Sequence, residues 1–211
     1  MKIKPGGMGL KAIRENDIAV RLPKTYAYLK HFEAPLRKRS GYRRYFKPTD
    51  PFYSTFNIGD YTFMTYRVAW AREDRALRAA VIGDIFSEST NLQKRIMPDQ
   101  TLQFVPCETE QEAHYVCSLL NNSISNYIAK SYTTDITTRI INTIPIRVFD
   151  STDALHQRLA HLSQEAHTAT AANDTTRVAA IEAEIDQLAA RLWGLTEAEL
   201  RDIQESLAEL G

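Results

Sequence analysis

The sequence predicts an α+β fold, in which a small mixed β-sheet packed with helices is followed by a C-terminal antiparallel helical hairpin. Residues 101–106 alternate two kinds of side chain, one set more apolar than the other, which is typical of a short strand. Thr109-Glu-Gln-Glu112 then forms a capping box, and the helix that follows places apolar side chains three or four positions apart. Residues 155–192 repeat apolar side chains at the same steps, as two antiparallel helices packed on each other do.

Residues before this centre predict a helix and then a loop. Glycines within 1–21 indicate an irregular lead-in, and Pro23 suits the first position of a helix. Pro35 interrupts that helix near its middle. Gly41, with two prolines after it, predicts a loop rather than a helix over residues 37–53.

The remaining strands are predicted from aromatic and β-branched side chains. Residues 61–70 form the clearest strand, and residues 77–86 are expected to continue the sheet. Residues 88–95 are expected to be a polar connection. Residues 140–149 are expected to form a final strand, in which Pro145 indicates an edge position or a bulge.

The last sixty residues are expected to be helical throughout. Gly194 is placed to end the second helix of the hairpin, and Thr196-Glu-Ala-Glu199 is a second capping box. We therefore expect a lead-in over 1–21, an α+β domain over 22–150, and the hairpin with a short final helix over 151–211.

Composition indicates a soluble cytoplasmic protein. Apolar residues make up 44% of the 211 residues and charged residues 25%, which is ordinary for a globular chain. No apolar run approaches the roughly 18 residues that span a membrane, and the N-terminus lacks a secretory signal. The two cysteines, Cys107 and Cys117, fit neither a disulfide framework nor a zinc site.

The charge is neutral overall but unevenly distributed. Residues 21–80 hold thirteen Lys and Arg against five acids, whereas residues 151–211 hold four Arg against eleven acids. This separation indicates that one part of the chain attracts a polyanion and the other repels it.

The basic residues are concentrated in a segment that also carries aromatic side chains. In residues 37–47, six cations are interleaved with Tyr42, Tyr45 and Phe46. Arg forks and Tyr hydroxyls at such a spacing hold DNA phosphates, although a solvated basic surface without a ligand is the alternative. A Thr-rich segment over residues 133–139 is either a further DNA contact or an ordinary loop. The candidate DNA-binding residues are Lys24, Arg37, Lys38, Arg39, Tyr42, Arg43, Arg44, Tyr45, Lys47, Tyr66, Arg67, Lys130, Thr137 and Arg139.

Arg67 is the candidate with two open interpretations. It lies on a predicted strand that is otherwise suited to burial. Its side chain either contacts DNA or pairs with a core carboxylate such as Glu73 or Asp99.

Several motifs, in this order, resemble one family. The stretches PDQTLQFVP, EQEAHYVCSLLNNS and IDQLAARLWGLTEAELRDI are similar to the C-terminal target-recognition region of TaqI-like and type IIG restriction-modification DNA methyltransferases, and shorter matches lie between them. The resemblance covers most of residues 22–210. It implies double-stranded DNA as a ligand and a methyltransferase catalytic domain or subunit as a partner, which flips an adenine into its own pocket.

The catalytic half of such an enzyme is not expected in this sequence. A Gly-rich S-adenosylmethionine loop is absent, and Asp50-Pro51 lacks the second proline of the base-holding motif. No spacing suggests a catalytic triad, a nuclease centre or a metal site, so we expect no catalysis, no cofactor and no metal. The alternative function is a protein-interaction module that assembles through its C-terminal helical hairpin.

Overall fold

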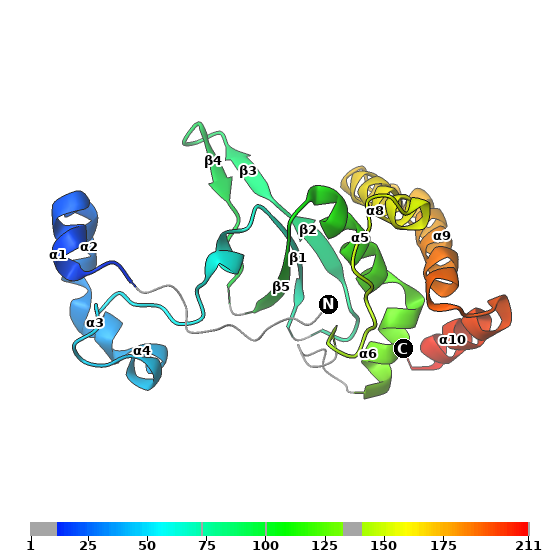
Figure 1. The fold of residues 1–211 in the computed structure, drawn as a ribbon, viewed down its shortest axis with the longest axis horizontal. Coiled ribbons are helices and arrows are strands. Elements are labelled where there is room, and N and C mark those ends of the chain that lie inside the picture. Colours follow the sequence, from blue (N-terminus) through cyan, green and yellow to red (C-terminus); the bar gives the residue numbers. More distant parts are fainter. Residues whose placement is uncertain (1–11, 73, 100, 133–140, 211) are drawn as a thin grey trace. The chain divides into compact units, whose positions relative to one another are not determined.

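The computed structural model describes residues 12–72, 74–99, 101–132 and 141–210. Within these residues the chain divides into two compact units, one over residues 12–63 and the other over residues 64–210 (Figure 1). The expected domain boundaries after residues 21 and 150 stay predictions.

The first unit is helical. Pro23 occupies the first turn of its helix, as predicted. Residues 37–53 are not a loop throughout, because residues 40–45 form a helix that includes Gly41. Burial of Tyr42, which is 5% exposed, compensates the low helix propensity of glycine. The elements are α1 (Glu15–Arg21), α2 (Pro23–His31), α3 (Glu33–Lys38), α4 (Ser40–Tyr45) and the 3₁₀ helix η1 (Asp60–Phe63).

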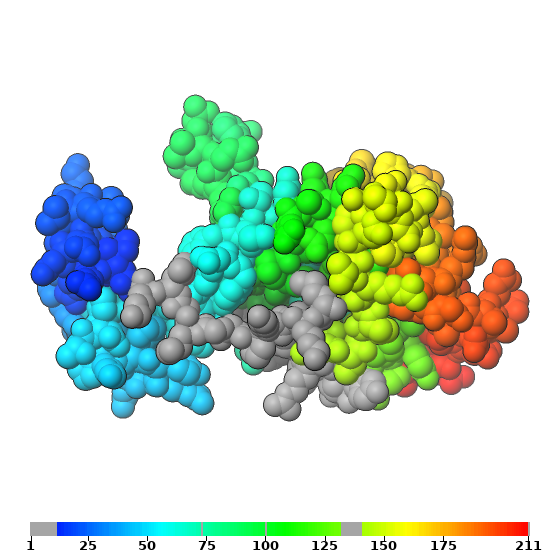
Figure 2. All heavy atoms as spheres, in the orientation of Figure 1, coloured from blue at the N-terminus to red at the C-terminus, as the bar shows by residue number. Residues whose placement is uncertain are grey.

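The second unit is built on a small antiparallel sheet, which confirms the α+β class. Its strand order is β2 (Ala79–Ile82), β1 (Tyr66–Ala71), β5 (Leu102–Cys107), and both pairings are antiparallel rather than mixed. A separate hairpin of β3 (Asp84–Ser87) and β4 (Leu92–Arg95) stands clear of this sheet (Figures 1 and 2).

Several expected elements are wrong. The strand expected over residues 61–70 begins only at Tyr66, and residues 84–86, expected to continue the sheet, pair with β4 in the separate hairpin. Residues 92–95, expected to be part of a polar connection, form strand β4. Residues 141–149, expected to lie in a strand, form none. There the Pro145 carbonyl accepts a hydrogen bond from the Trp193 indole at 3.0 Å, so a side chain takes the place of a neighbouring strand.

The core lies around α5 (Glu110–Asn121), which packs on β1 and β2 and also on α8 (Ala154–Ala171) (Figure 1). The Thr109 hydroxyl caps α5, and the second capping box, at Thr196 and Glu199, is present as predicted. Gly194 ends α9 with a φ of +76°, a conformation that favours glycine. The helices are α5 (Glu110–Asn121), α6 (Ser123–Tyr132), α8 (Ala154–Ala171), α9 (Thr175–Trp193) and α10 (Glu197–Glu209).

The apolar seams of the helical hairpin are buried within the chain itself. Leu159 and Leu162 of α8 and Ile181 and Ile185 of α9 are each less than 5% exposed. These side chains belong to the same core as α5 and the sheet. The seams therefore stabilise this unit rather than present an apolar surface.

Polar side chains from the helices satisfy the outer edge of β2. The Asn121 amide donates to the Ala79 carbonyl at 2.8 Å and accepts from its N–H at 2.7 Å. Asn126 does the same for Leu77, at 3.2 and 2.8 Å. His167 Nε2 accepts a hydrogen bond from the Val81 N–H at 3.1 Å. Each amide thus forms the pair of hydrogen bonds that a peptide group of another strand would form.

Candidate nucleic-acid interface

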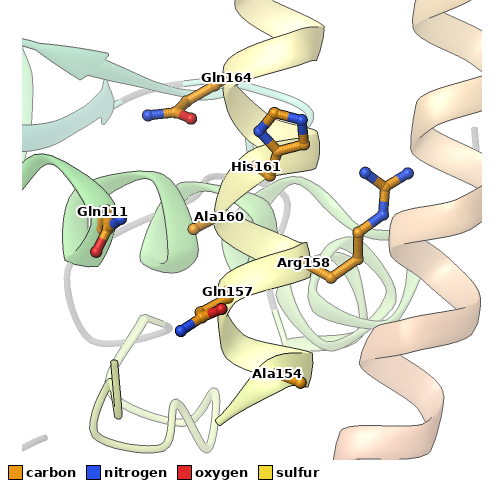
Figure 3. Close-up of a pocket in the computed structure, with 7 residues that line it drawn as sticks. All are labelled: Gln111, Ala154, Gln157, Arg158, Ala160, His161 and Gln164. Carbon is orange, nitrogen blue, oxygen red and sulfur yellow. The ribbon is translucent and has the colours of Figure 1, made fainter. Parts of the chain in front are cut away.

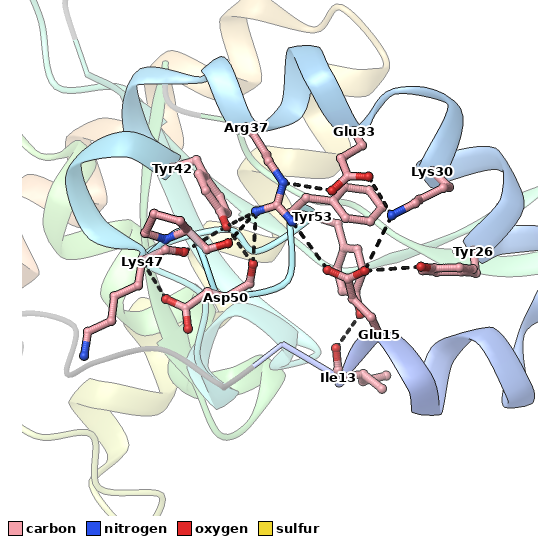
Figure 4. A network of polar contacts seen from close by, with 12 residues as sticks. Ile13, Glu15, Tyr26, Lys30, Glu33, Arg37, Tyr42, Lys47, Asp50 and Tyr53 are labelled. Atoms are coloured by element: carbon pink, nitrogen blue, oxygen red, sulfur yellow. Dashed lines mark hydrogen bonds and ion pairs between the residues drawn. The ribbon is translucent and has the colours of Figure 1, made fainter.

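Arg37 is the centre of a polar network that holds the first unit together (Figure 4). Glu33 and Arg37 are four residues apart on α3, and Arg37 Nε donates to the Glu33 carboxylate at 2.9 Å. Arg37 Nη1 donates to the Tyr42 hydroxyl at 2.8 Å and to the Pro48 carbonyl at 2.9 Å. A second carboxylate, that of Glu15, lies 3.7 Å from Arg37 Nη2. Arg37 therefore connects α1, α3, α4 and the turn that follows.

The same network sets the ionisation of Glu33. Lys30 Nζ lies 2.6 Å from the other Glu33 oxygen. Hydrogen bonds from Lys30 and then from Arg37 lower the pKa of the Glu33 carboxyl below its ordinary value, and the bond to Glu33 raises the pKa of Arg37. Both partners are thus held in their charged forms.

Arg39 is also used inside the unit. Its Nε donates to the Leu36 carbonyl at 2.9 Å, and its Nη2 donates to the carbonyls of Phe52 and Ser54 at 3.1 and 2.9 Å. Arg37 and Arg39 are predicted phosphate contacts, and the structure shows both side chains donating to oxygens of the first unit itself. The four-residue spacing of Glu33 and Arg37 was a signal for this in the sequence.

The other four cations of the segment are exposed. Lys38, Arg43, Arg44 and Lys47 all lie on the surface of the first unit, on or beside α3 and α4. None of them forms an ion pair within the described part of the chain, in contrast to Lys30 and Arg37. These four residues are named the α4 cation cluster. Lys24 is also exposed, on α2.

Tyr42 and Tyr45 have different environments although both lie on α4. The Tyr42 ring is buried, and its hydroxyl donates to the Asp50 carbonyl at 2.6 Å. Tyr42 therefore fixes α4 on the following turn and does not face solvent. Tyr45 is 51% exposed and stacks on Phe56, a residue that the sequence reasoning did not select.

The candidates of the second unit are not gathered at one site. Tyr66 is half-buried against the core. Arg67 is fully buried; its Nη2 donates to the Ile96 carbonyl at 2.6 Å, and its guanidinium carbon lies 5.8 Å from the Phe104 ring centroid. Burial in the core lowers the pKa of Arg67 below its ordinary value. Lys130 is half-buried on α6, and two further candidates, Thr137 and Arg139, lie outside the described residues.

The Ser–His pair of this unit is a packing feature. His114 Nδ1 lies 3.0 Å from Ser163 Oγ, at the contact between α5 and α8. Both residues are no more than 6% exposed, and burial lowers the pKa of His114 to about 4. A substrate has no access to such a hydroxyl. Burial also raises the pKa of the Cys107 thiol to about 12, which suppresses its nucleophilicity.

Two surface depressions lie on the second unit. One, of about 460 Å³, is lined by α8 side chains and by Gln111 of α5 (Figure 3). Its cation, Arg158, is bound to the carboxylates of Glu184 and Glu165 at 2.8 and 3.1 Å. Another, of about 510 Å³, is lined in part by Asn121, Asn126 and Lys130. Within residues 12–72, 74–99, 101–132 and 141–210, no group of three or more His, Cys, Asp or Glu side chains is arranged to hold a metal ion.

No protein-family model matches this chain, and no curated protein matches it significantly. Among the helices that the structure describes, none is long and apolar enough to cross a membrane.

Proposed function

We propose that this chain is the DNA-binding target-recognition module of an adenine DNA methyltransferase of the restriction-modification type, acting in the cytoplasm. The observation that carries the proposal is the α4 cation cluster, four exposed cations without carboxylate partners in the described residues. The resemblance of the sequence motifs supplies the enzyme class, and the cluster supplies the contact with DNA.

The uneven charge of the chain indicates which part contacts DNA in this proposal. The α4 cation cluster contacts phosphates, which gives affinity and orientation without sequence preference. Helices α8 to α10 lie in the acidic part of the chain and disfavour DNA on their own surface. Catalysis is assigned to a separate methyltransferase domain or subunit, which flips the adenine while this module fixes the position on the DNA.

The predicted contacts do not all enter this proposal. Arg37, Arg39 and Tyr42 position α4 and the turn after it, and their side chains are left out of the phosphate contacts. Arg67 is left out because its side chain is buried. Thr137 and Arg139 stay sequence predictions for base contacts.

The test is binding of the whole chain to duplex DNA at about 50 mM and about 200 mM salt. We expect affinity to fall steeply with salt, because each neutralised phosphate contributes about 0.9 to the logarithmic slope. The double variant Arg43→Ala/Arg44→Ala should lower this slope by about two units and weaken binding to all sequences alike.

The matched control removes the same charge elsewhere. Arg191 and Arg201 are exposed arginines of α9 and α10, in the acidic part of the chain. Arg191→Ala/Arg201→Ala should leave the salt slope unchanged. Equal slopes for the two double variants would remove the α4 cation cluster from the proposal. Adenine methylation that depends on adding this chain to a catalytic subunit would test the assigned enzyme class.

A further inference from the structure

An exposed aromatic pair lies at the end of α4. The rings of Tyr45 and Phe56 are stacked, with centroids 4.3 Å apart and planes at 20°. Tyr45 is 51% exposed and Phe56 47% exposed. Aromatic rings are normally buried when they are available for packing, so two half-exposed rings in one stack leave an apolar surface open.

The local structure holds this pair in place. Gly41 lies one turn before Tyr45 on the same side of α4. A Cβ at Gly41 would lie 3.4 Å from the Phe56 ring, so this ring packs directly against α4 at Gly41. The buried Tyr42, bonded to the Asp50 carbonyl, fixes the helix itself. The stack is therefore formed before any ligand binds.

One cation lies beside the pair. The Arg44 guanidinium carbon lies 5.4 Å from the Tyr45 ring centroid. Arg43 and Lys47, also of the α4 cation cluster, are exposed on either side of Tyr45 in the sequence. A ligand that suits this surface has a flat aromatic face and carries negative charge beside it.

We propose that the Tyr45–Phe56 pair is a stacking site for an unpaired nucleobase of the bound nucleic acid. A base in an intact duplex has both faces covered by its neighbours, whereas an extrahelical base has a free face for these rings. The phosphate next to that base would meet Arg44, whose guanidinium lies beside the Tyr45 ring. The inference rests on the proposed function, because the same cations hold the DNA.

The experiment compares a fully paired duplex with the same duplex carrying one extra, unpaired base, using the whole chain. Stacking of one base on aromatic side chains contributes enough for about a tenfold preference for the second duplex. Tyr45→Leu/Phe56→Leu should abolish this preference and leave the salt slope unchanged. Tyr28→Leu, which removes an aromatic ring that is 67% exposed on α2, should keep it. Lys38→Ala/Lys47→Ala should weaken binding to both duplexes equally.

A second measurement uses only the unaltered chain. The unpaired base is replaced by the fluorescent analogue 2-aminopurine, whose emission is expected to be quenched on binding if it stacks on the rings. Equal affinity for the two duplexes, or a preference that survives in Tyr45→Leu/Phe56→Leu, would overturn the stacking site and leave the proposed function intact. Failure to bind either duplex at low salt would overturn both.

Discussion

Replacing Arg37 and replacing Arg43 should have opposite consequences, although both are arginines of the same basic segment. Arg37→Met removes three hydrogen bonds of 2.9 Å or less, to Glu33, Tyr42 and Pro48. At about 1 kcal/mol each these contribute about 3 kcal/mol, and partial exposure of the side chain reduces this to about 2 kcal/mol. Arg43→Met removes no side-chain hydrogen bond found within the described residues, since the exposed Arg43 side chain forms none there.

Amide hydrogen exchange resolves this difference within the first unit. A loss of about 2 kcal/mol corresponds to about thirtyfold faster exchange of the protected amides over residues 42–54. We expect this acceleration in Arg37→Met and not in Arg43→Met, whereas weaker DNA binding without faster exchange is expected only in Arg43→Met. Equal exchange rates in the two variants would refute the structural role of Arg37.

Three further outcomes are expected in the second unit. Asn126→Ala leaves the N–H and carbonyl of Leu77 without their amide partner, so urea denaturation should show a loss of about 2 kcal/mol. The pKa of His114 is lowered to about 4, mainly by burial and also by His167, so the unfolded chain binds more protons between about pH 4 and 6.5. The contribution of neutral His114 to the free energy of unfolding should be complete above about pH 6.5 and be lost as the pH falls toward 4. If the urea midpoint of His114→Gln depended on pH in the same way as that of the original chain, this expectation would be contradicted. Gly194→Ala should cost about 1 kcal/mol because of the positive φ, and Gly194→Asn should cost less in a thermal melt.

The features that the sequence predicted best depend on a few neighbouring residues. The caps at Thr109 and Thr196 are fixed by side chains within three residues of the helix terminus, and the end of α9 is fixed by the positive φ of Gly194. The seams of α8 and α9 were equally clear, because their period is that of a helix. Caps and helical periodicity can therefore be recognised from the residues of one segment, without knowledge of its contacts with distant residues.

The features that were missed depend on contacts between distant residues. Strand β4 is exposed along its whole length, so its side chains carry no alternation to detect. Composition places Arg37 and Arg43 in the same class. The Glu33 carboxylate four positions before Arg37 is the local signal that separates them, and the further partners of Arg37 across the unit complete the difference. Asn121 and Asn126 are two of several polar residues in α5 and α6, and their role becomes clear only once β2 lies beside them.

The amide groups along β2 have a consequence for how this protein behaves at high concentration. An open sheet edge is a template on which a strand of another molecule can add, and this is a common start of aggregation. Here the positions that an incoming strand would use at Leu77, Ala79 and Val81 are already filled by side chains of the same chain. Three side chains, those of Asn121, Asn126 and His167, thus close one edge of the sheet against growth.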